Sequence, residues 1–298
     1  VQTCALPILS VVNLIRLHWA ALRALVVLTV VLGLVYPLLI WLIAQLPGLR
    51  AKAEGSIVTA GGKPVGSSLI GQSFTDGRGV PLARYFQGRP SAAGSGYDAM
   101  SSGASNLGPE SIVDTPSRPS LLTEVCDRSR TVGGFDSIDG TRPFCTPGGV
   151  GAVLSVIGPR DARGEVTRPT RVISVNEPCP AAPFLAEYRG VRVECASAGD
   201  EYRSGLLVTI RGDAPQNPAV PADAVTASAS GLDPDISPAY AQLQVSRVAA
   251  ARNVGTEDIA ALVRRHTEGP DLRVFGQPRV NVLELNLDLD ANYPVPGA

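Results

Sequence analysis

A chain of 298 residues is long enough for one or two domains and can bury a substantial core without disulfides or a metal. Its formal net charge of -1 at neutral pH provides no basic surface for nucleic acid, which argues against a nucleic-acid function. Hydrophobic residues make up 45% of the chain and charged ones 18%, while glycine and proline are frequent, so the composition predicts a membrane segment beside a loop-rich globular part.

The first predicted element is a membrane-spanning helix over residues 24–46. No side chain from Ala24 to Ala44 is charged, and at about 1.5 Å per residue this stretch covers the roughly 30 Å hydrocarbon core of a bilayer. The apolar region of a cleaved signal peptide is shorter, about 7–15 residues. An anchor is therefore favoured over a signal peptide or a buried helix of a soluble protein. Pro37 is expected to kink the helix near Gly33. Because the sequence begins with Val1 rather than methionine, no fold is predicted for the residues before about Leu14.

Positive charges do not settle the orientation of this helix, because Arg16 and Arg23 precede it while Arg50 and Lys52 follow it. The cysteines favour one answer. Four of the five follow the span and contain no Cys-x-x-Cys pair, which argues against zinc: Cys126, Cys145, Cys179 and Cys195. We interpret them as two disulfides of open connectivity, which persist in an oxidising compartment. Four unpaired core thiols are the alternative. The disulfide interpretation predicts a cytoplasmic stub, residues 1–23, and an extracytoplasmic remainder.

Short strands are predicted directly after the anchor, at residues 56–58 and 65–70 around a turn at Gly61–Pro64. Residues 74–111 are rich in glycine, serine and asparagine, as a linker would be. A linker has no need of apolar anchors, however, and this segment carries Tyr85, Phe86, Tyr97 and Leu107. We therefore expect an ordered surface loop.

Residues 112–217 are predicted to form a cysteine-bearing, β-rich insertion. Its β-prone runs are residues 151–157, 171–175, 190–193 and 205–210. The proline-rich stretch 213–221 is its expected exit. Residues 47–111 and 218–298 then form the first and second parts of one extracytoplasmic domain.

The last stretch is predicted to hold two helices and a strand. Ser237 and Pro238 supply an N-cap and a first-turn proline for a helix to about Asn253. Thr256 is expected to cap a second helix that ends before Gly269. From Arg279 to Leu289, leucines alternate with polar residues, which predicts a half-buried strand. The expected fold class is α+β: one transmembrane helix followed by a mixed domain with a β-rich insertion.

No catalytic or metal-binding constellation is visible. The two histidines, His18 and His266, support no Ser-His-Asp triad. Gly61–Lys63 lacks the rest of a P-loop and is better interpreted as a hairpin turn. The small-polar stretch from Thr226 to Pro234 could approach a phosphate or a partner backbone through its amides, but the residues alone favour a plain loop.

Several long blocks together resemble one family, the C subunit (KdpC) of the Kdp potassium-transporting P-type ATPase. The blocks are Ser68–Phe74, Tyr85–Ala93, Ser102–Pro109, Val220–Pro238 and Gly276–Leu287. The insertion departs from the compact family pattern and resembles that of actinobacterial versions. Ala104 stands where a second glycine is usual.

The resemblance implies an accessory subunit of an ATP-driven, high-affinity potassium import complex in the cell membrane. Its partners would be a potassium-binding A subunit, a catalytic P-type B subunit, a small F subunit and the lipid bilayer. The C subunit would stabilise the assembly and, like a chaperone, raise the ATP affinity of the B subunit. ATP and K⁺ would act at the level of the complex, with no cofactor bound to this chain and no catalytic residue in it.

The resemblance also assigns site residues. Nucleotide or partner contact falls on Thr226, Ser228, Ser230, Gly231 and Asp233, and the family-motif loop on Gln72, Phe74, Tyr85, Phe86, Arg89, Pro90, Ser91, Ser105, Asn106 and Gly108. The expected topology conflicts with direct nucleotide contact, because an outer domain cannot reach ATP bound in the cytoplasm. We therefore expect any effect on ATP to be conformational.

Two functions of other classes remain as alternatives. A membrane-tethered hydrolase would need a nucleophile with a neighbouring base, and histidine and lysine are scarce here. A membrane-anchored extracytoplasmic binding module would work without pump partners.

Overall fold

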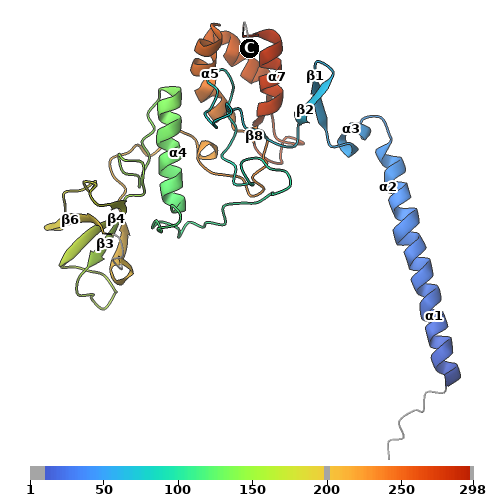
Figure 1. The fold of residues 1–298 in the computed structure, drawn as a ribbon, viewed down its shortest axis with the longest axis horizontal. Helices are drawn as coiled ribbons and strands as arrows, with labels where there is room; N and C mark the ends of the chain where they lie inside the picture. Colours follow the sequence, from blue (N-terminus) through green and yellow to red (C-terminus); the bar gives the residue numbers. More distant parts are fainter. Residues whose placement is uncertain (1–10, 198–201, 296–298) are drawn as a thin grey trace, which may run out of the picture. The chain divides into compact units, whose positions relative to one another are not determined.

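The computed structural model describes residues 11–197 and 202–295, so the first ten residues of the predicted stub lie outside it. The described chain divides into two compact units, Val1–Ile57 and Val58–Ala298. Each unit has its own architecture, and Figure 1 labels most of their helices and several of their strands.

The first unit consists mainly of one apolar helix of 34 residues, Val11–Ala44, and no residue of its most apolar window is buried. Among the described residues it is the one helix long and apolar enough to cross a bilayer. Its segments are α1 (Val11–Val30), a π-helical turn (Val31–Val35) and α2 (Tyr36–Ala44), and the short α3 (Arg50–Ala53) follows. The π-helical turn lies where Pro37, which has no N–H, leaves the carbonyl of Gly33 without its helical donor. The π-helical turn includes Gly33, near which the sequence predicts a kink.

The main core of the second unit lies between three helices and a small sheet. The helices are α5 (Pro238–Arg252), α6 (Thr256–Arg265) and α7 (Val282–Asn292), and the antiparallel sheet has the order β8 (Asp235–Ile236), β10 (Arg279–Asn281), β9 (Thr267–Glu268). Ile259, Leu262, Leu285 and Leu289 are fully buried there. A separate hairpin, β1 (Ile57–Ala60) and β2 (Lys63–Ser67), matches the predicted strands.

The predicted start of α5 is confirmed, because the Ser237 hydroxyl accepts a hydrogen bond of 3.1 Å from the backbone N–H of Tyr240. Asn253 ends the helix in the left-handed conformation. For α6 the predicted cap is wrong by one residue. Gly255 occupies the N-cap position and Thr256 is already helical.

The strand predicted from Arg279 to Leu289 is wrong beyond its first three residues. Only β10 is extended, and α7 begins at Val282. Asn281 caps the helix, accepting a bond of 3.1 Å from the N–H of Glu284. The buried residues of α7 are Val282, Leu283, Leu285, Asn286 and Leu289, which follow helical spacing. Leucine and glutamate with few β-branched neighbours favour a helix, although the alternation of leucines with polar residues is typical of a strand.

Residues 112–217 contain the predicted strands and one helix that the sequence analysis missed. Helix α4 (Leu121–Asp136) begins at Ser120, whose hydroxyl accepts from the N–H of Thr123. Its Val125 and Val132 pack against the main core. This segment therefore contributes to the domain core and is not purely β.

A five-stranded sheet follows α4, with the order β5-β6-β4-β3-β7. Its strands are β3 (Val153–Ile157), β4 (Arg171–Pro178), β5 (Glu187–Tyr188), β6 (Val191–Ala196) and β7 (Leu206–Thr209). Neighbours are antiparallel except β4 and β6, which run parallel. Leu154, Val156 and Val172 belong to a second core on this sheet. The α+β class is therefore confirmed.

Candidate functional site

The family-motif loop, residues 72–108, is held to the helices by two buried amide side chains. Asn286 on α7 accepts from the N–H of Phe86 and donates to its carbonyl, both at 2.9 Å. Gln244 on α5 does the same for Gln87, at 2.7 and 3.1 Å. Asn286 and Gln244 are at most 1% exposed, and the Phe86 side chain is fully buried in the core. The loop is therefore an ordered part of the domain, as predicted.

Arg89 joins the motif loop to the polar segment, which we define as residues 226–233. Its Nη1 lies 2.9 Å from Oδ2 of Asp233. Its Nε and Nη2 donate to the Thr226 carbonyl at 3.4 and 3.3 Å. Both partners of the ion pair are about one quarter exposed, at 24% and 29%. The main effect of the pair is therefore to position two backbone segments, and its contribution to the free energy of folding is small.

Ser91 makes the second link between these segments. Its hydroxyl donates to the Gly231 carbonyl at 2.6 Å and accepts from the N–H of Tyr97 at 2.8 Å. The Tyr97 hydroxyl in turn donates to the Arg89 carbonyl at 2.6 Å. Burial, with a smaller effect of the nearby Asp233 carboxylate, raises the pKa of Tyr97 to about 12. Tyr97 is thus a neutral hydrogen-bond donor at physiological pH.

The polar segment turns two of its carbonyls toward the motif loop and toward Gly71, the residue that precedes the loop. Those of Ser230 and Leu232 accept from the N–H groups of Gly103 and Gly71, at 2.9 and 2.8 Å. Gly231 has a φ of +68°, and a Cβ there would lie 2.7 Å from the Gly103 carbonyl oxygen. Only glycine satisfies both the backbone angle and the close approach. A phosphate-binding nest presents backbone N–H groups to the anion, whereas this segment uses its carbonyls to bind the rest of the domain. The segment therefore has little resemblance to such a nest.

A small open hollow of about 210 Å³ lies in the motif loop. It is lined by Gln72, Ser73, Thr75, the stretch Gln87–Ser91, which includes Pro90, and by Gly96 and Tyr97. Of the other predicted loop residues, Gln72 donates to the Val65 carbonyl at 2.8 Å, and Phe74 packs against Tyr85 with ring centroids 5.4 Å apart. Most of the residues that line the hollow thus belong to the family-motif blocks, and Thr75, Gly96 and Tyr97 do not.

Three predicted motif residues make only local contacts in the structure. The Ser105 hydroxyl accepts from the N–H of Leu107 at 3.4 Å, Asn106 has a φ of +55°, and the Gly108 carbonyl accepts from Ser111. Ser228 and Ser230 of the polar segment bring their hydroxyls within 3.4 Å of each other. The structure therefore brings together most, but not all, of the predicted site residues.

Two buried arginines on α5 were not found by the sequence analysis. The Arg252 side chain is 0% exposed, pairs with Asp290 at 2.7 Å, and donates to the carbonyls of Arg84 and Tyr293. Arg247 pairs with Asp136 of α4, also at 2.7 Å. A charged residue on a helix is usually taken as solvent-exposed, so no sequence signal marked either residue.

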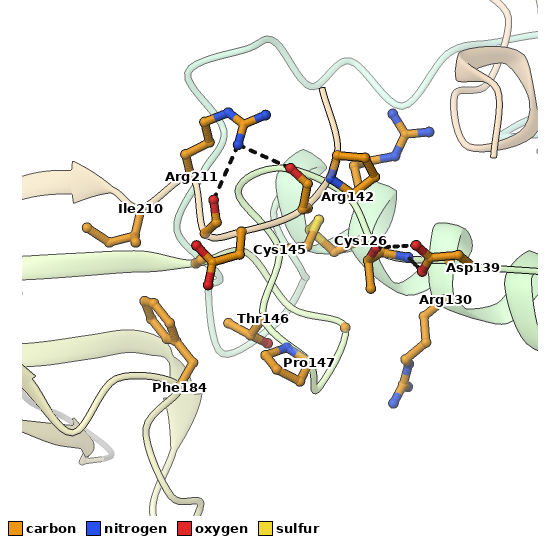
Figure 2. Close-up of a pocket in the computed structure, with 18 of the residues that line it drawn as sticks. Cys126, Arg130, Asp139, Arg142, Cys145, Thr146, Pro147, Phe184, Ile210 and Arg211 are labelled. Atoms are coloured by element: carbon orange, nitrogen blue, oxygen red, sulfur yellow. Dashed lines mark hydrogen bonds between the residues drawn. A yellow bond between two sulfur atoms is a disulfide. The ribbon is translucent and has the colours of Figure 1, made fainter. Parts of the chain in front are cut away.

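A larger cavity of about 630 Å³ borders α4 and the five-stranded sheet (Figure 2). Arg142 and Arg211 lie on one side, and Phe184 and Pro147 on the other. Arg142 donates to the Val220 carbonyl, and burial lowers the pKa of its guanidinium. No sequence pattern indicated this cavity, because its lining residues come from α4 and from several segments far apart in the chain.

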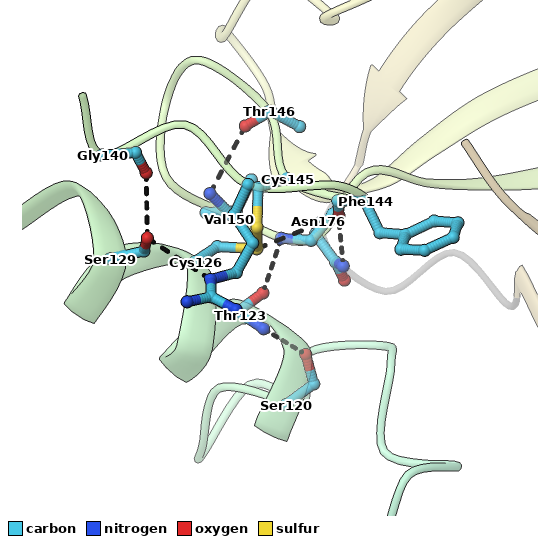
Figure 3. The surroundings of a disulfide bond; sticks show 12 residues. Ser120, Thr123, Cys126, Ser129, Gly140, Phe144, Cys145, Thr146, Val150 and Asn176 are labelled. Atoms are coloured by element: carbon cyan, nitrogen blue, oxygen red, sulfur yellow. Dashed lines mark hydrogen bonds between the residues drawn. A yellow bond between two sulfur atoms is a disulfide. The ribbon is translucent and has the colours of Figure 1, made fainter. Parts of the chain in front are cut away.

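The Cys126–Cys145 disulfide forms part of that cavity wall, and Cys179–Cys195 is the second disulfide. The connectivity that the sequence left open is therefore the one with the two shortest loops, and the alternative of four free thiols is wrong for this structure. Thr123 accepts from the N–H of Gly151 at 3.1 Å, and Ser129 donates to the Gly140 carbonyl at 2.9 Å, on either side of Cys126 (Figure 3). These bonds tie α4 to the loop that enters β3.

The described residues offer positioning contacts rather than reactive groups. His266 lies 2.9 Å from Asp288, and His18 is on the apolar helix, where its Nδ1 contacts the Leu14 carbonyl. Within residues 11–197 and 202–295 no group of three or more His, Cys, Asp or Glu residues could hold a metal ion. What the site provides is a rigid, shaped surface.

Comparisons with known proteins agree with this picture. A family model described as "KdpC: K+-transporting ATPase, c chain" matches residues 18–129 and 205–291, which leaves residues 130–204 unmatched. A potassium-transporting ATPase KdpC subunit of Kineococcus radiotolerans is 36% identical over 286 residues, covering 96% of this chain and 99% of that protein. The KdpC subunit of Streptomyces coelicolor is 38% identical, and the match covers 97% of this chain and 98% of that protein. The KdpC subunit of Caulobacter vibrioides is 36% identical, and the match covers 92% of each chain.

The matched residues include both the motif loop and the polar segment, and the unmatched ones include β3 to β6. The chain therefore belongs to the KdpC family and is a non-catalytic subunit of the potassium-transporting Kdp P-type ATPase.

Proposed function

We propose that this chain stabilises the assembled potassium-transporting complex. Its helix at residues 24–46 packs in the membrane against the potassium-binding A subunit through small residues such as Ala24 and Gly33. Residues 1–23 lie in the cytoplasm and the domain from residue 47 lies outside. The disulfides support this orientation, because such bonds persist in an oxidising compartment. The cysteine-bearing residues 112–217 act as an insertion of the outer domain.

One observation carries the proposal. The two family-matched stretches meet in a single hydrogen-bonded cluster of motif loop and polar segment, held by Arg89 and Ser91. Because the cluster has ordered backbone and no reactive group, it suits contact with a partner subunit. The exposed hydroxyl side of Ser228 and Ser230 is the surface that we assign to that contact.

The chain also raises the ATP affinity of the catalytic B subunit, in this proposal through conformational coupling. Direct nucleotide contact by Thr226, Gly231 or Asp233 has little support, because their carbonyl or carboxylate oxygens are engaged with Arg89 and Ser91. These oxygens would repel an anionic nucleotide, and no cluster of backbone N–H donors in the segment would offset that repulsion. The small F subunit completes the complex.

The test compares the whole chain with a version that ends at Ile57, coexpressed with the other subunits. Loss of complex recovery from mild detergent, together with weaker potassium uptake and a higher KM for ATP, is expected for the short version. Unchanged recovery and uptake would exclude an essential role of the outer domain. A periplasmic-type phosphatase reporter fused after Ala298 should be active; activity of a cytosolic reporter instead would overturn the orientation.

The contact surface has a test of its own, with a matched control. Ser228→Arg places a long charged side chain on the polar segment, and Ser117→Arg does so elsewhere, where the hydroxyl has a comparable contact of 3.3 Å with Thr115. Reduced recovery of the complex with Ser228→Arg only is expected. Equal recovery of both variants would remove the polar segment from the interface.

A further inference from the structure

Arg84 directly precedes the motif block Tyr85–Ala93 and is a cation without a carboxylate partner. Its side chain is half-buried, and its Nε atom is buried without a hydrogen-bond partner. Its guanidinium forms no ion pair with any residue that the structure describes. Because native proteins pair nearly all of their buried polar groups, a half-buried cation of this kind indicates a partner outside the chain.

The position of Arg84 is fixed by two buried arginines of α5. Arg247 donates to the carbonyls of Ala83 and Tyr85 at 2.7 and 2.9 Å, and Arg252 donates to the Arg84 carbonyl at 2.8 Å. The Arg84 guanidinium itself lies over the Tyr85 ring, 5.4 Å from its centroid. A side chain that is already held in place loses little conformational entropy when a partner binds it.

The Tyr85 ring has two guanidinium groups beside it but one carboxylate. Arg252 lies 5.1 Å from the ring centroid and pairs with Asp290 of α7 at 2.7 Å. The Tyr85 hydroxyl donates to the same carboxylate at 3.0 Å. Asp290 is therefore engaged by Arg252 and Tyr85, and the charge of Arg84 is left without a counter-charge.

The carboxylates of the neighbouring elements α4 and α7 and of the motif loop have partners of their own. These pairs are Asp136 with Arg247 at 2.7 Å, Asp288 with His266 at 2.9 Å, and Asp76 with Arg78 at 3.4 Å. An anion that pairs with Arg84 must therefore come from another molecule.

We propose that Arg84 is a docking point for an Asp or Glu side chain of a partner subunit in the assembled potassium-transporting complex. A planar guanidinium matches a carboxylate through two parallel hydrogen bonds, and the Nη atoms of Arg84, which are not among its buried nitrogens, are open to such a partner. Arg84 also lies in the stretch that the family model matches, residues 18–129. The inference rests on the proposed function, because it needs the assembled complex.

Zero-length crosslinking of the whole complex tests this. Arg84→Lys keeps the positive charge and supplies an amine, and a water-soluble carbodiimide activates a carboxylate that the amine then attacks, forming an amide and releasing a urea. The reaction joins groups that are in direct contact. Arg78→Lys is the matched control, because Arg78 lies in the same loop and its side chain is 86% exposed. Crosslinked peptides are identified by mass spectrometry.

An amide between position 84 and an Asp or Glu of a partner subunit is expected, in several-fold higher yield than any such product at position 78. Equal yields at the two positions would overturn the proposal. So would a product at position 84 that contains only Asp290 of the same chain, or an acidic residue of a second copy of it. A complex that is recovered without the crosslink contradicts this inference alone, whereas failure of the native chain to form a complex contradicts the proposed function.

Charge reversal gives a second readout on the same complex. Arg84→Glu should reduce the recovery of the complex from mild detergent about tenfold, because two like charges would face each other. Arg78→Glu should leave recovery unchanged, and the melting temperatures of the isolated variants show whether either one is unfolded. Equal recovery of the two folded variants would exclude Arg84 from the interface.

Discussion

The pair Arg247–Asp136 ties α4 to α5 and to the motif loop, and its removal should be costly. The two side chains are 7% and 2% exposed. Besides the ion pair, Arg247 donates to the carbonyls of Ala83 and Tyr85 at 2.7 and 2.9 Å, and its guanidinium lies 4.3 Å from the ring centroid of Phe135. Arg247→Met keeps most of the side-chain volume and removes all of these donors.

The expected loss is about 3–5 kcal/mol of unfolding free energy, because breaking a buried pair from one side leaves the other charge without compensation. Asp136 would then have to bind a proton or admit water beside α4. Asp136→Asn should cost less, since the amide still accepts a hydrogen bond from Arg247. The double variant should cost less than the sum of the two single ones, which would show that the residues are coupled.

Chemical unfolding of the full chain in detergent, followed by the far-ultraviolet signal, measures these differences. Arg130→Met on α4 is the control, because the pair of Arg130 with Asp127 is 58% exposed on both sides. That exposed pair should contribute at most about 1 kcal/mol. If Arg247→Met costs no more than Arg130→Met, the buried pair does not hold α4 against the core.

The pH dependence gives an independent check. Burial raises the pKa of the Asp136 carboxyl above its ordinary value of 3.8, and Arg247 only partly opposes the rise. The folded state then keeps the proton to higher pH than the unfolded state. The stability that proton binding to Asp136 contributes is fully present below the ordinary pKa of a carboxyl group and is lost as the pH rises through the raised pKa of the folded state. The stability of the native chain relative to Asp136→Asn should therefore fall with rising pH above 3.8, and a rise would refute the assignment.

Three further changes test the site and its scaffold. Gly231→Ala should lower the free energy of unfolding by more than about 1 kcal/mol, because the new Cβ meets the Gly103 carbonyl. The control, Gly212→Ala, lies in open space at a φ of +66° and adds only backbone strain. Equal shifts in the melting temperature of the two variants would contradict the packing argument. Asn286→Leu should lower the free energy of unfolding by about 2 kcal/mol or more in the same assay, because the backbone N–H and carbonyl of Phe86 lose their partner. A loss near zero would mean that water replaces the side-chain amide. Denatured without reductant, the chain should show one reactive thiol, Cys4, and with reductant five; more than one before reduction would contradict the pairing.

Local signals in the sequence were sufficient where one short segment carries all the relevant physics. The charge-free stretch after Arg23 predicted the long apolar helix, and Ser237 before Pro238 predicted the start of α5. The aromatic residues of the motif loop indicated an ordered segment before its partners were known. In each case the residues that decide the structure are neighbours in the chain.

Local signals failed where distant contacts decide. The alternation of leucines after Arg279 suggested a strand, but Asn286 can reach the Phe86 backbone from the α7 face that also buries Leu289. Helix α4 has a Ser120 N-cap and an acidic Glu124 in its first turn, both of which are recognisable start signals, and the sequence prediction still lacked it. The β-prone runs that follow this helix led to the prediction that all of residues 112–217 are β-rich.

By itself, then, the sequence determined the long apolar helix, the N-cap of α5, the α+β class and, through its motif blocks, the family. The tertiary structure alone decided which cysteines pair, that Arg89 and Ser91 join segments 140 residues apart through Gly231 and Asp233, and that Arg247 and Arg252 are buried. The reason is physical. A charged or polar side chain has no fixed environment until the chain folds, and whether water or a buried partner satisfies it depends on residues that the sequence places far away.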